Sequence, residues 1–133
     1  MTASPTQPRL VLLVDDDEDA RFVLKELLEH EGYAVEGVSG AEAALTRLAL
    51  APRPALIILD LLMPGVGGVR FLEIRSADRA LASIPVVVVT ASGLSCLGQN
   101  VFAVLPKPLD VAALLASVDQ ICGRPAMEAP GLP

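Results

Sequence analysis

The most constraining feature of this 133-residue sequence is a short apolar run that leads directly into a single carboxylate. Residues 55–59 read Ala-Leu-Ile-Ile-Leu, Asp60 follows at once, and Pro64 and Gly65 end the pattern. A run of this length, aliphatic throughout and closed by turn formers, predicts a strand that is buried on both faces. Strands of this kind belong to parallel sheets, so Asp60 is expected at the carboxyl end of a central strand. In open α/β sheets, ligands bind at that edge.

Four further apolar runs and the segments between them form an alternating pattern. The strand-like runs cover 9–14, 33–38, 84–90 and 101–105, and residues at helical spacing cover 18–30, 41–50, 69–77 and 110–121. Strands that alternate with helices predict parallel strands joined by right-handed crossovers. The predicted fold class is therefore α/β: a doubly wound five-stranded parallel sheet of order 2-1-3-4-5, flanked by helices and flavodoxin-like. Residues 91–100 are small and polar, which predicts a short or irregular fourth helix.

Three local predictions concern the first two helices and one loop. Ser39, with Glu42 three residues later, matches a capping box and is expected to begin the second helix. The first helix is expected to bury a stripe that includes Val23, and the acids at 17–19 are interpreted as complements to its dipole. The glycine-rich segment 65–68 lacks the Lys-Ser/Thr pair of a phosphate-binding loop, so we interpret it as a flexible loop.

Composition and charge restrict the class of protein. The length predicts one domain over 9–122, between tails at 1–8 and 123–133, with no output domain. No apolar run approaches the roughly 18 residues of a membrane span, and the N-terminus does not resemble a signal peptide, so a cytoplasmic protein is expected. A net charge of −6 and 3% aromatic residues do not favour direct nucleic-acid binding. Cys96 and Cys122 match no metal or redox motif and are expected to be reduced, structural thiols.

Side chains that can do chemistry follow four of the five predicted strands. These are Asp15 and Asp16 after the first strand, Asp60 at the third, Thr90 at the fourth and Lys107 after the fifth. The predicted strand order places the first strand beside the third, so the three carboxylates are expected to converge. Carboxylates so close resist joint ionisation, and a divalent cation with oxygen ligands, such as Mg²⁺, relieves the repulsion.

This set of groups suits phosphoryl transfer. The main task in that reaction is to position and neutralise charge on the transferred group. Lys107 supplies a mobile positive charge, Thr90 a hydroxyl donor, and Asp60 is the natural acceptor because a carboxylate can form an acyl phosphate.

The motifs Val14-Asp15-Asp16, Leu59 to Gly65, Val89-Thr90-Ala91 and Leu105 to Pro108 together resemble the receiver domain of two-component response regulators, the CheY-like family. The resemblance covers essentially residues 9–122. It implies that Asp60 is the phosphoacceptor, charged by a sensor histidine kinase, a phosphotransfer protein or a small phosphodonor. It also implies a downstream effector protein as partner, with no direct contact to nucleic acid or membrane.

The resemblance further implies individual roles at the site. Asp16 and Asp60 would bind Mg²⁺ directly, together with the backbone carbonyl of Leu62, while Asp15 would act through a metal-bound water. Thr90 and Lys107 would contact the new phosphoryl group. A cis peptide bond is implied before Pro108.

Two features depart from the family pattern. Thr90 and Lys107 are 17 residues apart, which is shorter than in most receivers by about one helical turn. Val104 occupies the position of the usual aromatic residue, with Phe102 two residues earlier. We therefore expect phosphorylation to remodel the segment 92–100 rather than a preformed helix.

The sequence raises three candidate functions. The leading one is a phospho-acceptor signalling switch, and the alternative is a receiver-like docking module that works without phosphorylation. A phosphatase with an Asp nucleophile would need a general acid two residues after Asp60, where Leu62 stands. We therefore expect no enzyme activity beyond self-catalysed phosphorylation of Asp60 and its autodephosphorylation.

Overall fold

The computed structural model describes residues 9–61, 67–91 and 101–123, which contain five strands and five helices. The strands are β1 (Leu10–Val14), β2 (Ala34–Val38), β3 (Leu56–Asp60), β4 (Val86–Thr90) and β5 (Ala103–Pro106). The helices are α1 (Glu18–His30), α2 (Ala41–Leu48), α3 (Gly67–Ala77), α4 (Arg79–Ala82) and α5 (Val111–Cys122). None of the described helices is both long and apolar enough to cross a membrane.

The five strands form one parallel sheet in the order β2-β1-β3-β4-β5, which confirms the predicted topology. From β1 the chain first moves outward to β2 and then returns past β1 to β3. The direction of winding therefore reverses between β1 and β3, where Val14 lies opposite Leu59. This register brings the carboxyl ends of the two strands level with each other.

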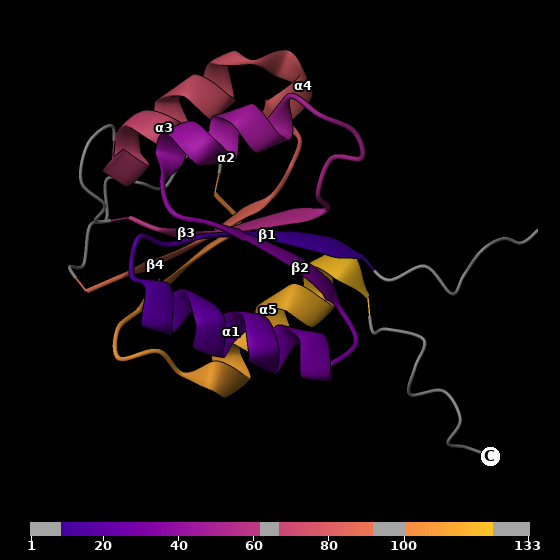
Figure 1. The fold of residues 1–133 in the computed structure, drawn as a ribbon, viewed down its shortest axis with the longest axis vertical. Helices are drawn as coiled ribbons and strands as arrows, with labels where there is room; N and C mark the ends of the chain where they lie inside the picture. The colour runs from indigo at the N-terminus through magenta and orange to yellow at the C-terminus, as the bar shows by residue number, and fades with distance from the viewer. Residues whose placement is uncertain (1–8, 62–66, 92–100, 124–133) are drawn as a thin grey trace, which may run out of the picture.

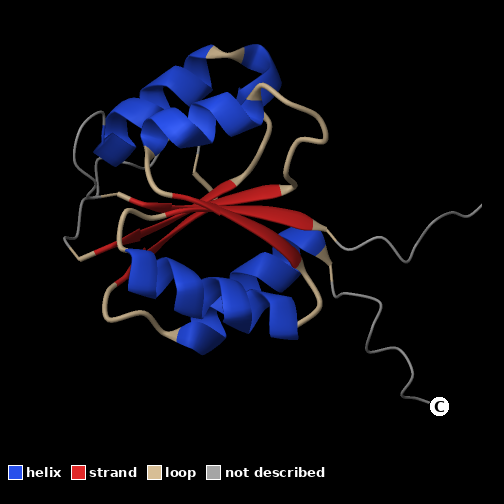
Figure 2. Ribbon diagram, in the orientation of Figure 1, coloured by secondary structure: helices blue, strands red, loops and turns tan. Residues whose placement is uncertain are grey.

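Helices cover both faces of the sheet, so the molecule has three layers (Figures 1 and 2). α1 and α5 pack on one face, and α2, α3 and α4 pack on the other. Alternate residues of the central strands divide between the two faces, as the pleat of a strand requires. One core contains Val11, Leu13, Ile58, Val87, Val89, Leu28, Leu114 and Val118. The other contains Leu12, Val14, Ile57, Leu59, Val86, Val88, Ala44, Leu48 and Phe71.

The predicted capping box at the start of α2 is wrong. The N-cap is Gly40, and no side chain caps this helix end. The amide of Ala44 donates to the carbonyl of Gly40 at 3.0 Å, which is the first hydrogen bond of the helix. Ser39 therefore lies one residue too early to reach the free amides of the first turn. The helix also ends at Leu48, two residues before the predicted end.

Two of the glycines that we interpreted as a flexible loop begin a helix instead. Gly67 and Gly68 form the start of α3, and the amide of Gly68 donates to the carbonyl of Leu61 at 3.1 Å. A Cβ at position 68 would lie 2.5 Å from that carbonyl oxygen. The glycine is thus required by the close approach of two backbones.

The segments around β4 differ from the prediction in detail. The short helix α4 before this strand was not predicted; Asp78 caps it by accepting from the amides of Ala80 and Leu81. This helix has only four residues and begins at a single capping side chain, so the sequence shows no helical periodicity that would predict it. The predicted short fourth helix and the remodelling of 92–100 lie outside the described residues. β5 starts at Ala103, two residues later than predicted.

Candidate functional site

The carboxyl ends of four strands bring the predicted site residues to one edge of the sheet, the left edge in Figure 1. Asp60 is the last residue of β3 and Thr90 the last residue of β4. Asp15 directly follows β1, and its amide donates to the carbonyl of Val38 at 3.1 Å. Lys107 directly follows β5, and its amide donates to the carbonyl of Thr90 at 3.0 Å. Main-chain hydrogen bonds thus hold Asp15 and Lys107 against the neighbouring strands β2 and β4.

Three carboxylates meet at this edge. Oxygen atoms of Asp15, Asp16 and Asp60 all lie within 4.8 Å of one another. Asp15 and Asp60 are 4% and 8% exposed, whereas Asp16 is open to solvent. Hard oxygen donors with one side open to water suit Mg²⁺, which usually keeps several of its waters when it binds protein. The geometry therefore fits a metal ion; Leu62, whose carbonyl the resemblance implies as a further ligand, lies outside the described residues.

The protein itself compensates the negative charge of this cluster only in part. Burial is the largest cause that raises the pKa of Asp15, and the neighbouring Asp60 raises it further by its charge and by a hydrogen bond. The amide of Asp17, 2.9 Å from Asp15 Oδ1, and the more distant Lys107 lower this pKa. The net result is a raised pKa, so the site favours a further positive charge.

Lys107 supplies one such charge next to Asp60. Its Nζ lies 3.5 Å from Asp60 Oδ1, and its side chain is 40% exposed. The peptide bond between Lys107 and Pro108 is cis, as the resemblance implied. Thr90 is only 2% exposed at the end of its strand. The structure thus brings together the described site residues that the sequence predicted, while their roles remain predictions.

The carboxylate of Asp17 caps α1 and is not one of the three clustered carboxylates. Its carboxylate accepts from the amides of Asp19 and Ala20 at 3.0 and 3.2 Å. The interpretation of Asp17 as a structural residue at the start of the helix is therefore confirmed, and its specific role is that of the N-cap.

Two arginines with defined structural roles were not predicted from the sequence: one beside the acidic cluster and one away from it. Arg21 donates from Nη1 to the backbone carbonyl of Asp15 at 2.7 Å. The macrodipole disfavours a cation in the first turn of a helix, so the position of Arg21 in the sequence already indicated a specific contact for its side chain. Arg75 is 2% exposed and donates to the carbonyls of Ala82 and Ile84. Its position four residues after the buried Phe71, on the same face of α3, was the corresponding signal.

An apolar groove opens next to the carboxylates, between α1 and the segment that leads into α5. Its volume is about 500 Å³, and its lining includes Asp60 and Lys107. Val23 and Val111 line it and are 62% and 41% exposed. The prediction that Val23 is buried is therefore wrong, because the groove leaves this part of the helical stripe uncovered.

Comparison with known proteins identifies the family. The family model of the response regulator receiver domain matches residues 11–119. The chain belongs to the response regulator receiver family. This receiver domain is therefore related to two-component signalling, as the motifs at the strand ends implied.

Curated relatives and solved structures agree with this assignment. The receiver is 31% identical over 127 residues to protein Rrf1 of Nitratidesulfovibrio vulgaris, covering 95% of this chain and 91% of the relative. It is 37% identical over 119 residues to the transcriptional regulatory protein CpxR of Escherichia coli, covering 86% of this chain but only 49% of CpxR. It thus spans about half the length of that relative. A response regulator receiver protein from Pseudomonas putida has a TM-score of 0.79 at 29% identity, covering 86% of this chain and 98% of that one.

Proposed function

We propose that this receiver domain is a phosphorylation switch in which Asp60 accepts a phosphoryl group in a Mg²⁺-dependent reaction. The donor is a sensor histidine kinase, a phosphotransfer protein or a small phosphodonor, and the modified domain changes the surface that a downstream effector binds. One observation carries the proposal. Asp60 lies where three carboxylates converge within 4.8 Å, and its Oδ1 lies 3.5 Å from the ammonium of Lys107.

The chemistry follows from these groups. A carboxylate oxygen of Asp60 attacks the phosphorus of a phosphohistidine; the P–N bond breaks, and its electron pair stays on the imidazole nitrogen. The product is an acyl phosphate. Lys107 acts as a point charge that pairs with the transferred group, and the hydroxyl of Thr90 donates to it. Asp15, Asp16, Asp60 and the carbonyl of Leu62 would hold Mg²⁺, which neutralises charge on the phosphoryl oxygens when bound.

The groove beside Asp60 supports a protein as donor. Its walls are mostly apolar, and the exposed apolar side chains that line it include Val23 and Val111, which are 62% and 41% exposed. Exposed apolar patches of this kind mark surfaces where other proteins dock. A partner that covers this groove would carry its phosphohistidine to within reach of Asp60.

The proposal is tested by exposing the chain to acetyl phosphate, and separately to beryllofluoride, with and without Mg²⁺. Intact mass is expected to show one added phosphoryl group per chain, and fluorine NMR one bound beryllofluoride, in both cases only with Mg²⁺. Asp60→Asn is expected to show neither adduct. An absent adduct on the wild type, or an equal one on Asp60→Asn, would refute the switch and favour the phosphorylation-independent docking module.

Two further properties belong to the same proposal. The chain is not a turnover enzyme, so phosphate release from acetyl phosphate is expected to be limited by the slow autodephosphorylation of Asp60. Rapid turnover of the donor without accumulation of the adduct would contradict this. A cytoplasmic location remains a prediction, which cell fractionation of the tagged chain tests.

A further inference from the structure

Arg21 places a positive charge where a helix disfavours one. It lies in the first turn of α1, whose free backbone amides and macrodipole repel cations. Within the described ranges its guanidinium takes part in no ion pair. Its Nη1 instead donates to the backbone carbonyl of Asp15 at 2.7 Å. The side chain therefore reaches backward, across the start of its own helix, to the turn that carries the acidic residues.

This hydrogen bond holds one of the two peptide groups that flank Asp16. The carbonyl of Asp15 belongs to the peptide group before Asp16, and Arg21 holds it. The amide of Asp17 belongs to the peptide group after Asp16, and it donates to Asp15 Oδ1 at 2.9 Å. Fixing both peptide planes sets the φ and ψ angles of Asp16, since these are its only soft backbone angles.

The direction of the Asp16 side chain depends on this backbone control. Asp16 is exposed, and its carboxylate has no hydrogen-bond partner among the described residues. Asp15 and Asp60, in contrast, are buried at the ends of packed strands. Of the three carboxylates, Asp16 is therefore the one whose placement relies on the turn.

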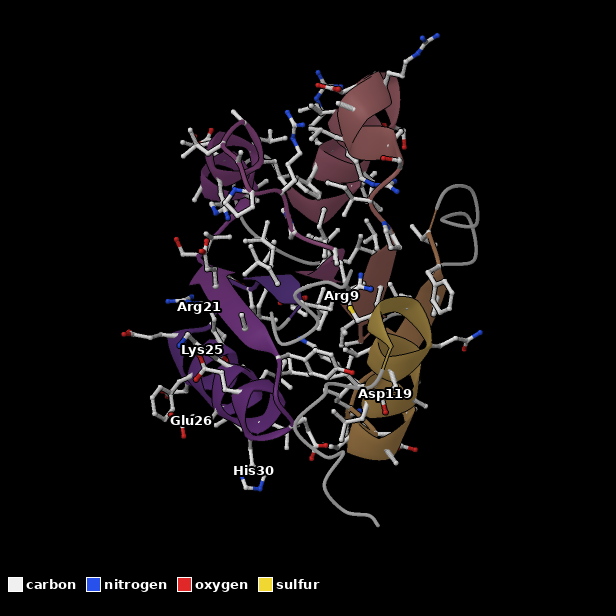
Figure 3. All side chains as sticks on the ribbon, turned by 90° about the vertical axis from the view of Figure 1, so that its right-hand side faces the viewer. Arg9, Arg21, Lys25, Glu26, His30 and Asp119 are labelled. Carbon is white, nitrogen blue, oxygen red and sulfur yellow. The ribbon has the colours of Figure 1, made fainter. Side chains whose placement is uncertain are left out.

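A glycine in the neighbouring strand provides the space that Arg21 needs. A Cβ at Gly37 of β2 would lie 3.0 Å from Cδ and 3.1 Å from Cγ of Arg21. The aliphatic stem of the arginine thus lies directly over this glycine. In Figure 3, Arg21 and Lys25 both lie on the part of α1 that is next to β2.

We propose that Arg21 is a positioning residue for the metal site. It holds the carbonyl of Asp15 so that the carboxylate of Asp16 lies beside those of Asp15 and Asp60. Gly37, which has no side chain, leaves the space that the stem of Arg21 occupies. The inference rests on the proposed Mg²⁺-dependent function. It assigns to Arg21 a role through the backbone of the acidic turn, without direct contact to the ion.

Positioning and simple electrostatics predict opposite effects when this charge is removed. A cation near a metal site repels the metal, so its loss alone would tighten Mg²⁺ binding. Loss of the hydrogen bond frees the turn and weakens binding, because partners that orient metal ligands are worth on the order of tenfold in affinity. The sign of the change therefore separates the two roles.

The experiment compares Arg21→Met with Lys25→Met in the full chain. Lys25 lies one turn further along α1 and pairs with Glu29 on the surface, so its substitution removes the same charge but no contact to the acidic turn. Mg²⁺ affinity is measured by titration calorimetry with the metal alone. Amide hydrogen exchange at Asp17 reports the state of the turn independently of any reaction. Thermal unfolding establishes that each variant is folded.

For Arg21→Met we expect Mg²⁺ binding weaker by on the order of tenfold and faster exchange of the Asp17 amide, while Lys25→Met binds as tightly as the wild type or slightly more tightly. Gly37→Ala keeps every charge and is expected to weaken binding in the same direction, by a few-fold. A folded Arg21→Met that binds Mg²⁺ equally or more tightly overturns the inference. If Arg21→Met does not fold, Gly37→Ala decides by the same criterion. A wild-type chain that binds no Mg²⁺ overturns the proposed function and this inference with it.

Discussion

Gly68→Ala tests how closely the start of α3 must approach the strand that carries Asp60. A Cβ at position 68 would lie 2.5 Å from the carbonyl oxygen of Leu61, 2.7 Å from its Cα and 2.9 Å from its carbonyl carbon. Ordinary contacts begin near 3.4 Å, so the two backbones must separate by about 0.9 Å at this point. All three atoms belong to the backbone of the residue after Asp60, so the strain cannot be relieved by turning a side chain.

The expected cost follows from three contributions. Overpacking of this kind costs about 1–3 kcal/mol. The separation also weakens the hydrogen bond from the Gly68 amide to the Leu61 carbonyl, now 3.1 Å long, which contributes about 1 kcal/mol. The better helix propensity of alanine returns up to about 1 kcal/mol. We therefore expect the free energy of unfolding to fall by about 2 kcal/mol.

Urea unfolding followed by circular dichroism measures this change as a midpoint lowered by about 1 M. Gly40→Ala is the matched control, because Gly40 has an extended φ of −177° and a Cβ there meets nothing within 4 Å. Gly40 is the N-cap of α2, where alanine is less favourable than glycine, so the expected loss is at most about 1 kcal/mol and smaller than for Gly68→Ala. Gly68→Ala should also slow labelling by acetyl phosphate, since Leu61 adjoins the acceptor. Equal stability of the two variants would refute the steric reasoning.

Three further predictions concern parts of the fold away from the carboxylates. Arg75→Met should lower the free energy of unfolding by about 3 kcal/mol in urea, because the buried carbonyl of Ile84 and the partly buried carbonyl of Ala82 lose the donor that the guanidinium provides. Arg79→Met, at an exposed position, is its control, and an equal effect of both would contradict the argument. Tyr33→Phe should cost about 1–2 kcal/mol by thermal or urea unfolding, since the hydroxyl donates to the Asp119 carboxylate and also lies 3.2 Å from the carbonyl of Gly123, the C-cap of α5. A neutral result would mean that water replaces this bond. Burial raises the pKa of the Cys122 thiol, so less of the reactive thiolate is present at a given pH. Alkylation of Cys122 by iodoacetamide, measured by mass spectrometry of its peptide, should therefore be at least about a hundredfold slower in the folded protein than in urea. Rapid labelling of the folded protein would contradict the buried placement.

Periodicity and residue type predicted much of this protein because they act locally. The run that ends at Asp60 has no polar residue, so it had to be covered on both faces, and this requirement leads to a parallel sheet with helices on either side. Strand order then follows from the few connections that parallel strands allow. Once the sheet is parallel, Asp15, Asp60, Thr90 and Lys107 must lie at the same edge.

Contacts between residues distant in the sequence were decided only by the tertiary structure. The sequence predicted a loop at Gly68, whereas the structure has a helix there because Gly68 packs against the backbone of Leu61. No local sequence pattern at either residue predicts this contact. Val23 has the spacing of a core residue, yet it lines the groove and is 62% exposed. Helix spacing defines an apolar face but cannot say how far its neighbour extends.

The acidic site shows the same division. The sequence by itself determined which side chains gather at the edge of the sheet, because strand ends and strand order follow from local patterns. Only the tertiary structure decided how they are held: Lys107 at 3.5 Å from Asp60, and Arg21 on the carbonyl of Asp15 beside Gly37. These contacts join separate elements, and their geometry depends on packing of the whole layer rather than on the composition of any one segment.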